Sequence, residues 1–286
     1  MTILARERFK TNLYDNSKCS ACRGCIVACK DNNQLPGKSD IDPSSFVSQL
    51  TQERFKGNYS TKESTDGNTY TILRYNEFDD PVDGLHWNFS KFQCMHCIEP
   101  ECEKVCPRNA YTKNEWGATV QDPTKCIGCQ YCATACPFGV PKYRKHTDTI
   151  TKCTLCVERV NEGLKPACAR TCPTGALTFG YRDELLVIAR DRAKFLRANG
   201  FPRATVYGDE ELGTGTNKLY VFTDTPDKFG MPVNPQIEGN TIFWQNWVKP
   251  YAGWLIPLAL AGSAISFVTS RVLANKQGEH SEGGHE

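Results

Sequence analysis

The sequence carries no surplus of charge of either sign and none of the motifs that indicate nucleotide binding or covalent catalysis. Lysine and arginine total 34 residues against 32 aspartates and glutamates, which gives a net charge of +2. Surfaces that bind nucleic acid need a basic surplus, so we expect no nucleic-acid partner. A Rossmann glycine fingerprint, a phosphate loop and a nucleophile paired with a base are also missing. These absences argue against chemistry on a substrate within this chain.

Cysteine, by contrast, is abundant, with 16 residues in a chain of 286. Every cysteine belongs to a quartet that ends in C-x3-C, and none is left over. Three quartets continue into proline, which turns the chain away after the last thiol because it fixes φ and lacks an N–H. The first quartet has Lys30 at that place. The quartets are Cys19, Cys22, Cys25 and Cys29; Cys94, Cys97, Cys102 and Cys106; Cys126, Cys129, Cys132 and Cys136; and Cys153, Cys156, Cys168 and Cys172.

The spacing of these thiols is that of bacterial ferredoxins. From Cys126 to Cys136 it follows the C-x2-C-x2-C-x3-C-P run, in which the fourth cysteine ligates the other cluster of a pair. Structural zinc sites usually combine two distant C-x2-C pairs, often with histidine, and disulfide frameworks belong to small secreted domains. We therefore expect iron–sulfur ligation, and a zinc-stabilised scaffold is the alternative from another class. Spacing alone permits the third quartet to pair with either the second or the fourth.

The segments between the quartets predict short strands around the cysteine-rich part. TYTILRYNEF, residues 69–78, has the β-branched and aromatic composition of a strand. GATVQD, residues 117–122, and GALTFG, residues 175–180, are shorter, and we expect them to form small sheets packed around clusters. The polar insertion before residue 69 indicates loop, with a short helix near Phe46–Phe55. His96 stands between two cysteines and is expected to be a polar neighbour of a cluster rather than a ligand.

Beyond the last quartet, the pattern predicts a helix and a strand that cover the core. RDELLVIARDRAKFLRANG, residues 182–200, repeats apolar residues at helical spacing, with Asp183 as the N-cap and Gly200 as the stop. KLYVFT, residues Lys218 to Thr223, is typical of a strand. We interpret this part as scaffold rather than as a catalytic element.

The C-terminal part differs in kind because it contains a long apolar run. Residues Tyr251 to Ser270 carry no charge, and a helix of about 20 residues spans roughly 30 Å, the thickness of a hydrocarbon core. We predict one membrane-spanning helix here, in preference to a buried soluble helix, which usually has a polar face. Aromatic residues near its start resemble an interfacial belt. They are Trp244, Trp247, Tyr251 and Trp254.

Small residues in this apolar run favour contact with another helix. Ala259 and Ser263 are four positions apart, as are Gly262 and Ser266. Small side chains at this spacing let two helices approach closely within a membrane. A membrane-embedded partner is therefore favoured over a simple anchor.

Together, these features resemble the four-cluster iron–sulfur subunits of molybdenum or tungsten oxidoreductases and related hydrogenase complexes. The stretches KCTLCVERVNEGLKPACARTCPTGALTFG and VYGDEELGTGTNKLYVF and the terminal apolar run are most similar to the beta subunit of membrane-bound respiratory formate dehydrogenase. The resemblance implies an α+β fold of two ferredoxin-like [4Fe-4S] units with pseudo-twofold symmetry, followed by a single transmembrane helix. The expected parts are 1–90 with 145–182 (first unit), 91–144 (second unit), 183–243 (cover segment), 244–272 (transmembrane helix) and 273–286 (polar tail).

The crossed ligation of this family, carried over to the matching positions, implies four [4Fe-4S] clusters. In the family the first quartet pairs with the last, and the second pairs with the third. Some relatives lack one cysteine of the third quartet and hold a three-iron cluster there, but this chain has all of them. The implied ligand sets are Cys19, Cys22, Cys25 and Cys172; Cys153, Cys156, Cys168 and Cys29; Cys94, Cys97, Cys102 and Cys136; and Cys126, Cys129, Cys132 and Cys106.

The function implied by the resemblance is an electron relay. Formate is oxidised on a separate molybdopterin or tungstopterin alpha subunit, towards which the first pair of clusters is expected to lie. Electrons then pass to a membrane cytochrome b gamma subunit and on to a quinone. The alternatives are the same relay in a hydrogenase or in a sulfur-compound (DMSO-type) reductase complex.

The expected location is the bacterial inner membrane, with a single pass through the lipid. No N-terminal signal peptide is recognised, and Glu7 separates Arg6 from Arg8, so no twin-arginine motif is present. In the family the export signal sits on the catalytic partner. Arg271 and Lys276 follow the apolar run and favour a cytoplasmic C-terminus, which leaves the cluster domain in the periplasm.

Overall fold

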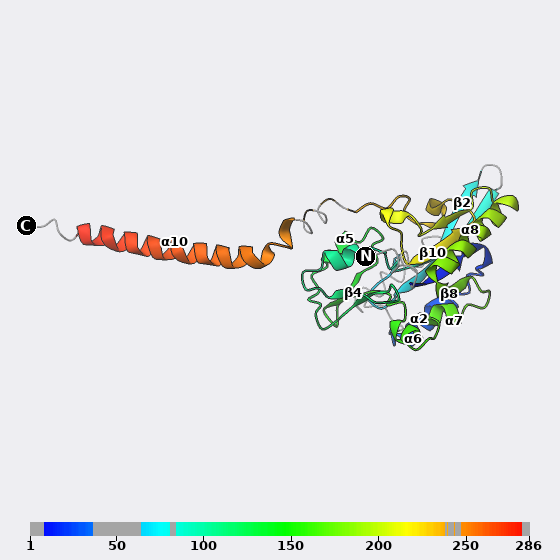
Figure 1. Ribbon diagram of the computed structural model, residues 1–286, viewed down its shortest axis with the longest axis horizontal. Helices are drawn as coiled ribbons and strands as arrows, with labels where there is room; N and C mark the ends of the chain where they lie inside the picture. The colour runs from blue at the N-terminus through cyan, green and yellow to red at the C-terminus, as the bar shows by residue number, and fades with distance from the viewer. Residues whose placement is uncertain are drawn as a thin grey trace, which may run out of the picture. The chain divides into compact units, whose positions relative to one another are not determined.

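The computed structural model describes residues 9–36, 64–80, 84–237, 239, 243 and 247–281 (Figure 1). The chain divides into two compact units, Met1–Glu238 and Gly239–Glu286. The first is a mixed α and β unit that contains every cysteine, and the second contains one long helix among its described residues. The helix predicted near Phe46–Phe55 and the aromatic Trp244 lie outside the described residues.

The first unit is built on a sheet of four strands in the order β8-β1-β10-β9. β1 (Lys10–Asp15) runs parallel to β10 (Lys218–Phe222) and antiparallel to β8 (Leu177–Tyr181), and β9 (Thr205–Tyr207) pairs with the other side of β10. The strand predicted from KLYVFT is confirmed as β10. GALTFG also contains a strand, β8, but this strand belongs to the central sheet and not to a small sheet of its own, because β1 pairs with it.

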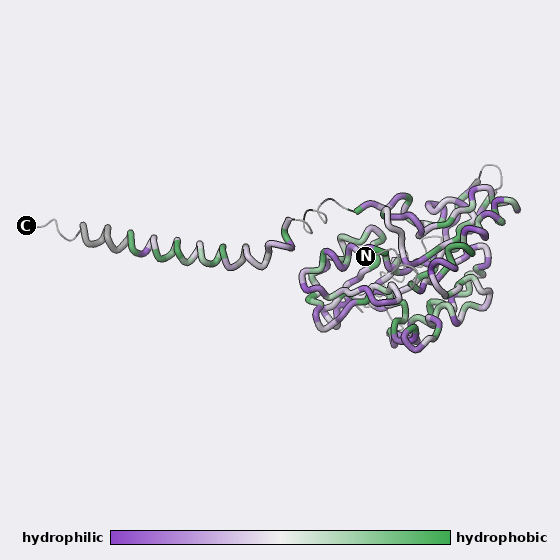
Figure 2. Tube along the Cα trace, viewed as in Figure 1, coloured by the Kyte–Doolittle hydropathy of each residue, from purple (hydrophilic) through white to green (hydrophobic). Residues whose placement is uncertain are grey.

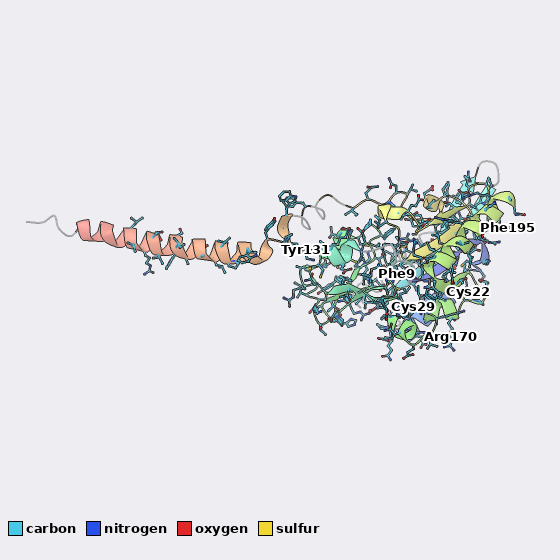
Figure 3. All side chains as sticks on the ribbon, in the orientation of Figure 1. Phe9, Cys22, Cys29, Tyr131, Arg170 and Phe195 are labelled. Carbon is cyan, nitrogen blue, oxygen red and sulfur yellow. The ribbon has the colours of Figure 1, made fainter. Side chains whose placement is uncertain are left out.

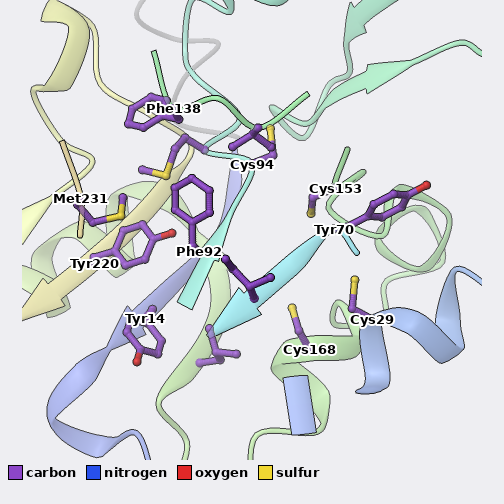
Figure 4. Packing of buried hydrophobic residues seen from close by; sticks show 14 of the residues in the cluster. Tyr14, Cys29, Tyr70, Phe92, Cys94, Phe138, Cys153, Cys168, Tyr220 and Met231 are labelled. Atoms are coloured by element: carbon purple, nitrogen blue, oxygen red, sulfur yellow. The ribbon is translucent and has the colours of Figure 1, made fainter. Parts of the chain in front are cut away.

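The two faces of this sheet bury different side chains, because successive residues of a strand point to opposite faces. On one face, Leu13 and Leu219 pack beneath α8 (Arg182–Ala198). On the other, Tyr14 and Tyr220 belong to the same buried cluster as several cysteines, as Figure 4 shows for part of it. The sheet therefore separates an aliphatic layer under α8 from an aromatic layer beside the thiols.

The start of α8 corrects one expectation. The helix begins at Arg182, whose N–H donates to the carbonyl of Phe9 at 2.7 Å and whose guanidinium donates to the carbonyl of Thr216 at 3.1 Å. Asp183 therefore lies in the first turn, and its prediction as the N-cap is wrong. Its carboxylate still faces the positive end of the helix dipole. Gly200 follows the helix with a φ of +94°, as the predicted stop requires.

Three two-stranded hairpins complete the strands of the described part. The strand predicted from TYTILRYNEF is confirmed as β2 (Thr71–Asp80), which pairs along its whole length with β3 (Gly84–Gln93). β3 was not predicted, although the alternation of apolar and polar residues from Leu85 to Ser90 was the available signal. The strand predicted from GATVQD is confirmed as β5. The short hairpins are β4 (Tyr111–Lys113) with β5 (Thr119–Gln121) and β6 (Lys142–Arg144) with β7 (Thr149–Thr151).

Short helices accompany the cysteines. Four of them contain a cysteine, and α6 directly follows one. They are α2 (Gly24–Asn32), α4 (Glu101–Lys104), α5 (Tyr131–Ala135), α6 (Val157–Asn161) and α7 (Ala167–Arg170), and the 3-10 turns are η1 (Asn16–Lys18), η2 (Glu211–Gly213) and η3 (Pro226–Phe229). The thiols are thus held by short turns and helices around the central sheet.

The second unit contains α10 (Ala252–Ser281), a helix that includes Pro257. Its described side chains are exposed, among them Trp254 and Leu258, and apolar residues recur along its length (Figure 2). Among the described residues, no helix combines the length and the apolar character that crossing a membrane requires. The span predicted over residues 251–270 stays a prediction.

Candidate functional site

Four cavities in the first unit are each lined by four cysteines. We name each cavity by its first cysteine. The Cys19 cavity has Cys19, Cys22, Cys25 and Cys172; the Cys29 cavity has Cys29, Cys153, Cys156 and Cys168; the Cys94 cavity has Cys94, Cys97, Cys102 and Cys136; and the Cys106 cavity has Cys106, Cys126, Cys129 and Cys132.

In every cavity, three thiols come from one quartet and the fourth is the last cysteine of another quartet. Cys172 joins the first quartet, and Cys29 joins the last. In the same way Cys136 joins the second quartet, and Cys106 joins the third. The structure thus brings the sixteen thiols together in the groups that the crossed ligation requires. Their ligation of clusters stays a prediction.

The same backbone turn occurs in all four cysteine loops. The residue two positions after the first cysteine has a positive φ, which is +56° at Ala21, +47° at His96, +67° at Gly128 and +58° at Leu155. Such an angle costs roughly 1–2 kcal/mol when the residue has a Cβ, so it persists only where other interactions hold it. At Ala21, His96 and Leu155 the backbone N–H donates to the sulfur of the first cysteine, at 3.4 Å in each case. The turn therefore provides each of these sulfurs with a donor that stabilises negative charge.

The first quartet departs from the other three because Lys30 replaces the proline after its last cysteine. Cys29 lies inside α2, so the next residue must continue the helix, which proline would interrupt. In the other quartets, the last cysteine follows a helix rather than lying within it. Lys30 also ties the loop that follows, because its Nζ donates to the carbonyls of Pro36 at 2.9 Å and Asn68 at 3.0 Å.

The cavities differ in the exposure of their thiols. All the thiols of the Cys29 cavity are buried, and Figure 4 shows Cys153 and Cys168 facing one another with Cys29 beside them. The Cys94 cavity has one buried and three half-buried thiols. Cys22 in the Cys19 cavity (Figure 3) and Cys129 in the Cys106 cavity are exposed. Only the Cys19 and Cys106 cavities therefore have an exposed thiol.

Burial sets the protonation state of the thiols in the absence of metal. It raises the pKa of Cys25 and Cys132 from 9.0 to about 11, and that of Cys153 to about 12. At neutral pH these groups stay protonated unless a cation replaces the proton. Iron held by these thiols would provide that positive charge, and its binding would release protons.

Side chains outside the cysteine motifs also donate to the sulfurs. In the Cys106 cavity, the hydroxyl of Tyr111 donates to Cys132 at 3.3 Å. In the Cys29 cavity the donors are three asparagine amides, at Asn12 with Cys168 (3.8 Å), Asn32 with Cys156 (3.8 Å) and Asn33 with Cys29 (3.7 Å). Sequence reasoning missed these residues. Asn32 and Asn33 follow the first quartet closely, so their position in the sequence could have indicated them as donors. Asn12 is 156 residues away from its thiol, and no local pattern indicates it.

His96 lines the Cys94 cavity and is completely buried. Its Nδ1 accepts from the N–H of Thr119 at 3.1 Å, so the ring proton lies on Nε2, which has no hydrogen-bond partner among the described residues. Burial, followed by the nearby Lys152, lowers the pKa of His96 well below its ordinary value. The ring is therefore neutral, as expected for a polar neighbour of a cluster.

The residues present fit an iron–sulfur cluster in each cavity. Cysteine sulfurs are the usual ligands of [4Fe-4S] clusters, four to a cluster, and each cavity presents four. Within the described part of the chain, no three His, Cys, Asp or Glu side chains are placed so as to hold a metal ion. The set of four sulfurs and the backbone N–H donors to the first sulfur of three loops together match a negatively charged group held by thiolates.

Comparisons with known proteins agree with this arrangement. A family described as "4Fe-4S dicluster domain" matches residues 85–182. The chain is 36% identical over 260 residues to the formate dehydrogenase iron–sulfur subunit of Haemophilus influenzae, which covers 90% of this chain and 78% of the relative. It is 33% identical over 277 residues to the nitrate-inducible formate dehydrogenase iron–sulfur subunit of Escherichia coli K12, and the alignment covers 96% of this chain and 88% of the relative.

A third relative comes from a different complex. The hydrogenase-2 operon protein HybA of Escherichia coli O157:H7 is 30% identical over 308 residues, with 95% of this chain and 86% of the relative covered. The formate dehydrogenase subunits are more similar to this chain, at 33% to 36% identity over most of its length. The chain therefore belongs to the family of formate dehydrogenase iron–sulfur subunits.

Proposed function

We propose that this chain is the electron-transfer subunit of a membrane-associated formate dehydrogenase complex and carries electrons through four [4Fe-4S] clusters. The observation that carries the proposal is that the four cavities follow one another in series, with an exposed thiol only in the first and the last. An electron relay needs exchange with partners at its two ends and shielding from water between them. Burial in the middle and exposure at the ends meet both needs.

Thiols of neighbouring cavities lie close enough to affect one another, which supports this order. Burial raises the pKa of Cys25 in the Cys19 cavity, and Cys168 in the Cys29 cavity adds to that rise. Burial and then Cys94 raise the pKa of Cys153, which joins the Cys29 cavity to the Cys94 cavity. The first three cavities are therefore consecutive.

Tyr111 connects the last two cavities. Burial raises the pKa of this phenol most, and the next largest causes of the rise are Cys132 in the Cys106 cavity and Cys102 in the Cys94 cavity. The side chain therefore lies beside thiols of both cavities. The proposed series runs from the Cys19 cavity through the Cys29 and Cys94 cavities to the Cys106 cavity.

The residues of this chain hold and insulate the electron carriers. When bound, each cluster supplies a one-electron redox centre whose potential depends on nearby charge, hydrogen bonds and solvent. The backbone N–H groups of Ala21, His96 and Leu155 stabilise negative charge on the sulfurs, which favours the reduced state. Buried aromatic residues such as Tyr14 and Phe138 exclude water from the same core.

The proposed partners follow from the relatives and from α10. We propose a molybdopterin or tungstopterin subunit as the formate-oxidising partner, and a membrane cytochrome b subunit that reduces quinone as the acceptor. The hydroxyls of Ser263, Thr269 and Ser270 donate to carbonyls of their own helix, which removes polar groups from its surface. Such a helix suits contact with lipid and with a membrane partner. The cluster unit would face the periplasm and the C-terminus the cytoplasm of the bacterial inner membrane.

A second candidate is the same relay with a hydrogenase as the catalytic partner, which the likeness to HybA favours. Metal analysis of the intact complex separates the two candidates. Molybdenum or tungsten, about sixteen irons per chain and reduction of the clusters by formate are expected. Nickel, with reduction by hydrogen and not by formate, would establish the second candidate. Stoichiometric zinc in a colourless protein would exclude both.

Removal of α10 tests the proposed route by which electrons leave this chain for the membrane partner. A complex truncated after Lys249 should keep its clusters, because every cysteine precedes this point. It should still reduce an artificial dye with formate, while formate-dependent quinone reduction falls sharply. Quinone reduction at the full rate from a membrane-bound truncated complex would show that α10 has no part in the exit. Loss of dye reduction would assign α10 to assembly instead.

A further inference from the structure

Lys91 carries a charged group that is buried without an evident partner. The side chain is 0% exposed, and Nζ has no hydrogen-bond partner among the described residues. Removing an ammonium group from water strongly disfavours its charged form unless an opposite charge compensates. A charged lysine at this position therefore needs a negatively charged group nearby.

Strand β3 places Lys91 between the Cys19 cavity and the Cys29 cavity. Its direct partner on β2 is Leu73, which lines the Cys19 cavity. Directly opposite residues of antiparallel strands share a face, as do residues two positions apart on one strand. Gln93, two positions along β3, lines the Cys29 cavity. The face that holds Lys91 is thus shared with the linings of both cavities.

The electrostatics of the core agree with this placement. Burial lowers the pKa of Lys91, but thiols of both cavities, first Cys168 and then Cys25, outweigh burial and raise it above its ordinary value. Lys218 is also fully buried without a hydrogen-bond partner in the described part, but burial and then Lys91 lower its pKa to about 7. Of the two lysines, Lys91 has the surroundings that keep it charged.

We propose that Lys91 is a positioning residue for electron transfer, whose fixed positive charge raises the reduction potential of the clusters in the Cys19 and Cys29 cavities. This inference rests on the proposed function. Each reduction adds one electron, which the formate-oxidising partner supplies, to a cluster already surrounded by thiolates, and the ammonium of Lys91 keeps its proton throughout. The positive charge stabilises the reduced form more than the oxidised form.

The test is a redox titration of the intact complex, followed by EPR, with the variant Lys91→Met. Methionine has a similar length and no charge. Signals are assigned to cavities with single cysteine variants. At a fixed potential, the ratio of reduced to oxidised cluster in the Cys19 or the Cys29 cavity should fall at least tenfold, which corresponds to about 59 mV for one electron. The signal of the Cys106 cavity, where no thiol with a resolved shift is affected by Lys91, should stay unchanged and serves as the control within each sample.

The variant Lys91→Arg separates charge from shape. It should assemble and retain wild-type potentials, including in the case that Lys91→Met fails to assemble. Unchanged potentials in Lys91→Met, equal shifts in both variants, or failure of both to assemble would each overturn the role of the charge. Iron content and the number of EPR signals in the unmodified complex test the proposed function separately. A complex with four clusters and no effect of Lys91 would refute this inference alone.

Discussion

The two inner cavities, those of Cys29 and Cys94, differ from the two outer ones, those of Cys19 and Cys106, in how their loops are covered. All four loops share the positive-φ turn after the first cysteine. Each outer cavity takes three thiols from a C-x2-C-x2-C run and exposes the middle one, Cys22 or Cys129. The inner cavities take theirs from quartets with longer second spacings, C-x2-C-x4-C and C-x2-C-x11-C.

The longer spacings supply the residues that cover the inner thiols. Between Cys156 and Cys168 the chain forms α6 and the start of α7, and both thiols are buried. Between Cys97 and Cys102 it begins α4, and neither of these thiols is fully exposed. The comparison indicates that the loop turn provides ligand geometry, whereas the insertion after the second cysteine decides whether a cluster is shielded or within reach of a partner.

The largest expected effect contrasts one thiol from each class. Cys153→Ala removes a buried thiol from an inner cavity. We expect the complex to fail to assemble, because the other three buried thiols of the Cys29 cavity would lose the cluster that they are proposed to share. Cys129→Ala should remove only the outer cluster, about four irons, and leave dye reduction by formate in place. Iron analysis and EPR of both variants provide the measurement. Equal losses in the two variants would remove the distinction between inner and outer cavities.

A second contrast uses the shared turn. Gly128 has a φ of +67°, and an added Cβ would lie 2.5 Å from the carbonyl oxygen of Asp148, so Gly128→Ala should destabilise the first unit by about 2–4 kcal/mol. At the equivalent position of the other outer loop, the reverse substitution should have the opposite effect on stability. Ala21→Gly relieves a positive φ of +56° and should stabilise by up to about 1 kcal/mol. Thermal unfolding of the assembled complex checks both signs, and two shifts of the same sign would contradict the common turn.

A third contrast concerns the reactivity of thiols in protein from which iron has been removed. Cys22 is exposed and should be alkylated first, whereas Cys153 is buried with a pKa of about 12. Since only the thiolate reacts, labelling of Cys153 should rise about tenfold for each unit by which the pH increases below that pKa. Mass spectrometry of labelled peptides between pH 7 and 10 gives the rates. Fast labelling of Cys153 at pH 7 would show that burial in the inner cavity depends on the metal.

The smallest expected effect comes from a single hydrogen bond in an outer cavity. Tyr111→Phe removes the donor that lies 3.3 Å from the sulfur of Cys132. A bond of this kind contributes about 1 kcal/mol. The reduction potential of the cluster in the Cys106 cavity should therefore fall. At a fixed potential, the ratio of reduced to oxidised cluster should decrease by less than tenfold. Redox titration against the unchanged signal of the Cys19 cavity measures the shift. A rise in potential would contradict the role of the hydroxyl as a donor to the thiolate.

Local patterns were sufficient to predict the four cysteine quartets and several strands. The spacing in each quartet is a local property, and β2, β5 and β10 follow from runs of β-branched and aromatic residues. Spacing left open which quartets exchange their last cysteine. The family resemblance supplied the pairing of Cys29 with the last quartet, and the structure brings these thiols into one cavity.

Features that depend on distant residues could not be predicted. β1 is recognisable only through its neighbours, because KTNLYD has little strand character by itself. The helix start at Arg182 depends on carbonyls of Phe9 and Thr216, which no local capping rule considers. The roles of Asn12 and Lys91 could not be predicted for the same reason, because each interacts with thiols from another part of the sequence.

The central sheet has a consequence for the order of events during synthesis. β1 leaves the ribosome before its parallel neighbour β10, which follows about 200 residues later, as the bond from Thr11 to Asn217 across 206 positions shows. At about 5–20 residues per second, this interval lasts roughly 10–40 s. The Cys94 and Cys106 cavities draw all their thiols from residues 94–136 and can form well before then. The Cys19 and Cys29 cavities need thiols from both ends of the cysteine-rich part, so on the proposed ligation their clusters cannot be complete until Cys172 and Cys168, respectively, have been made.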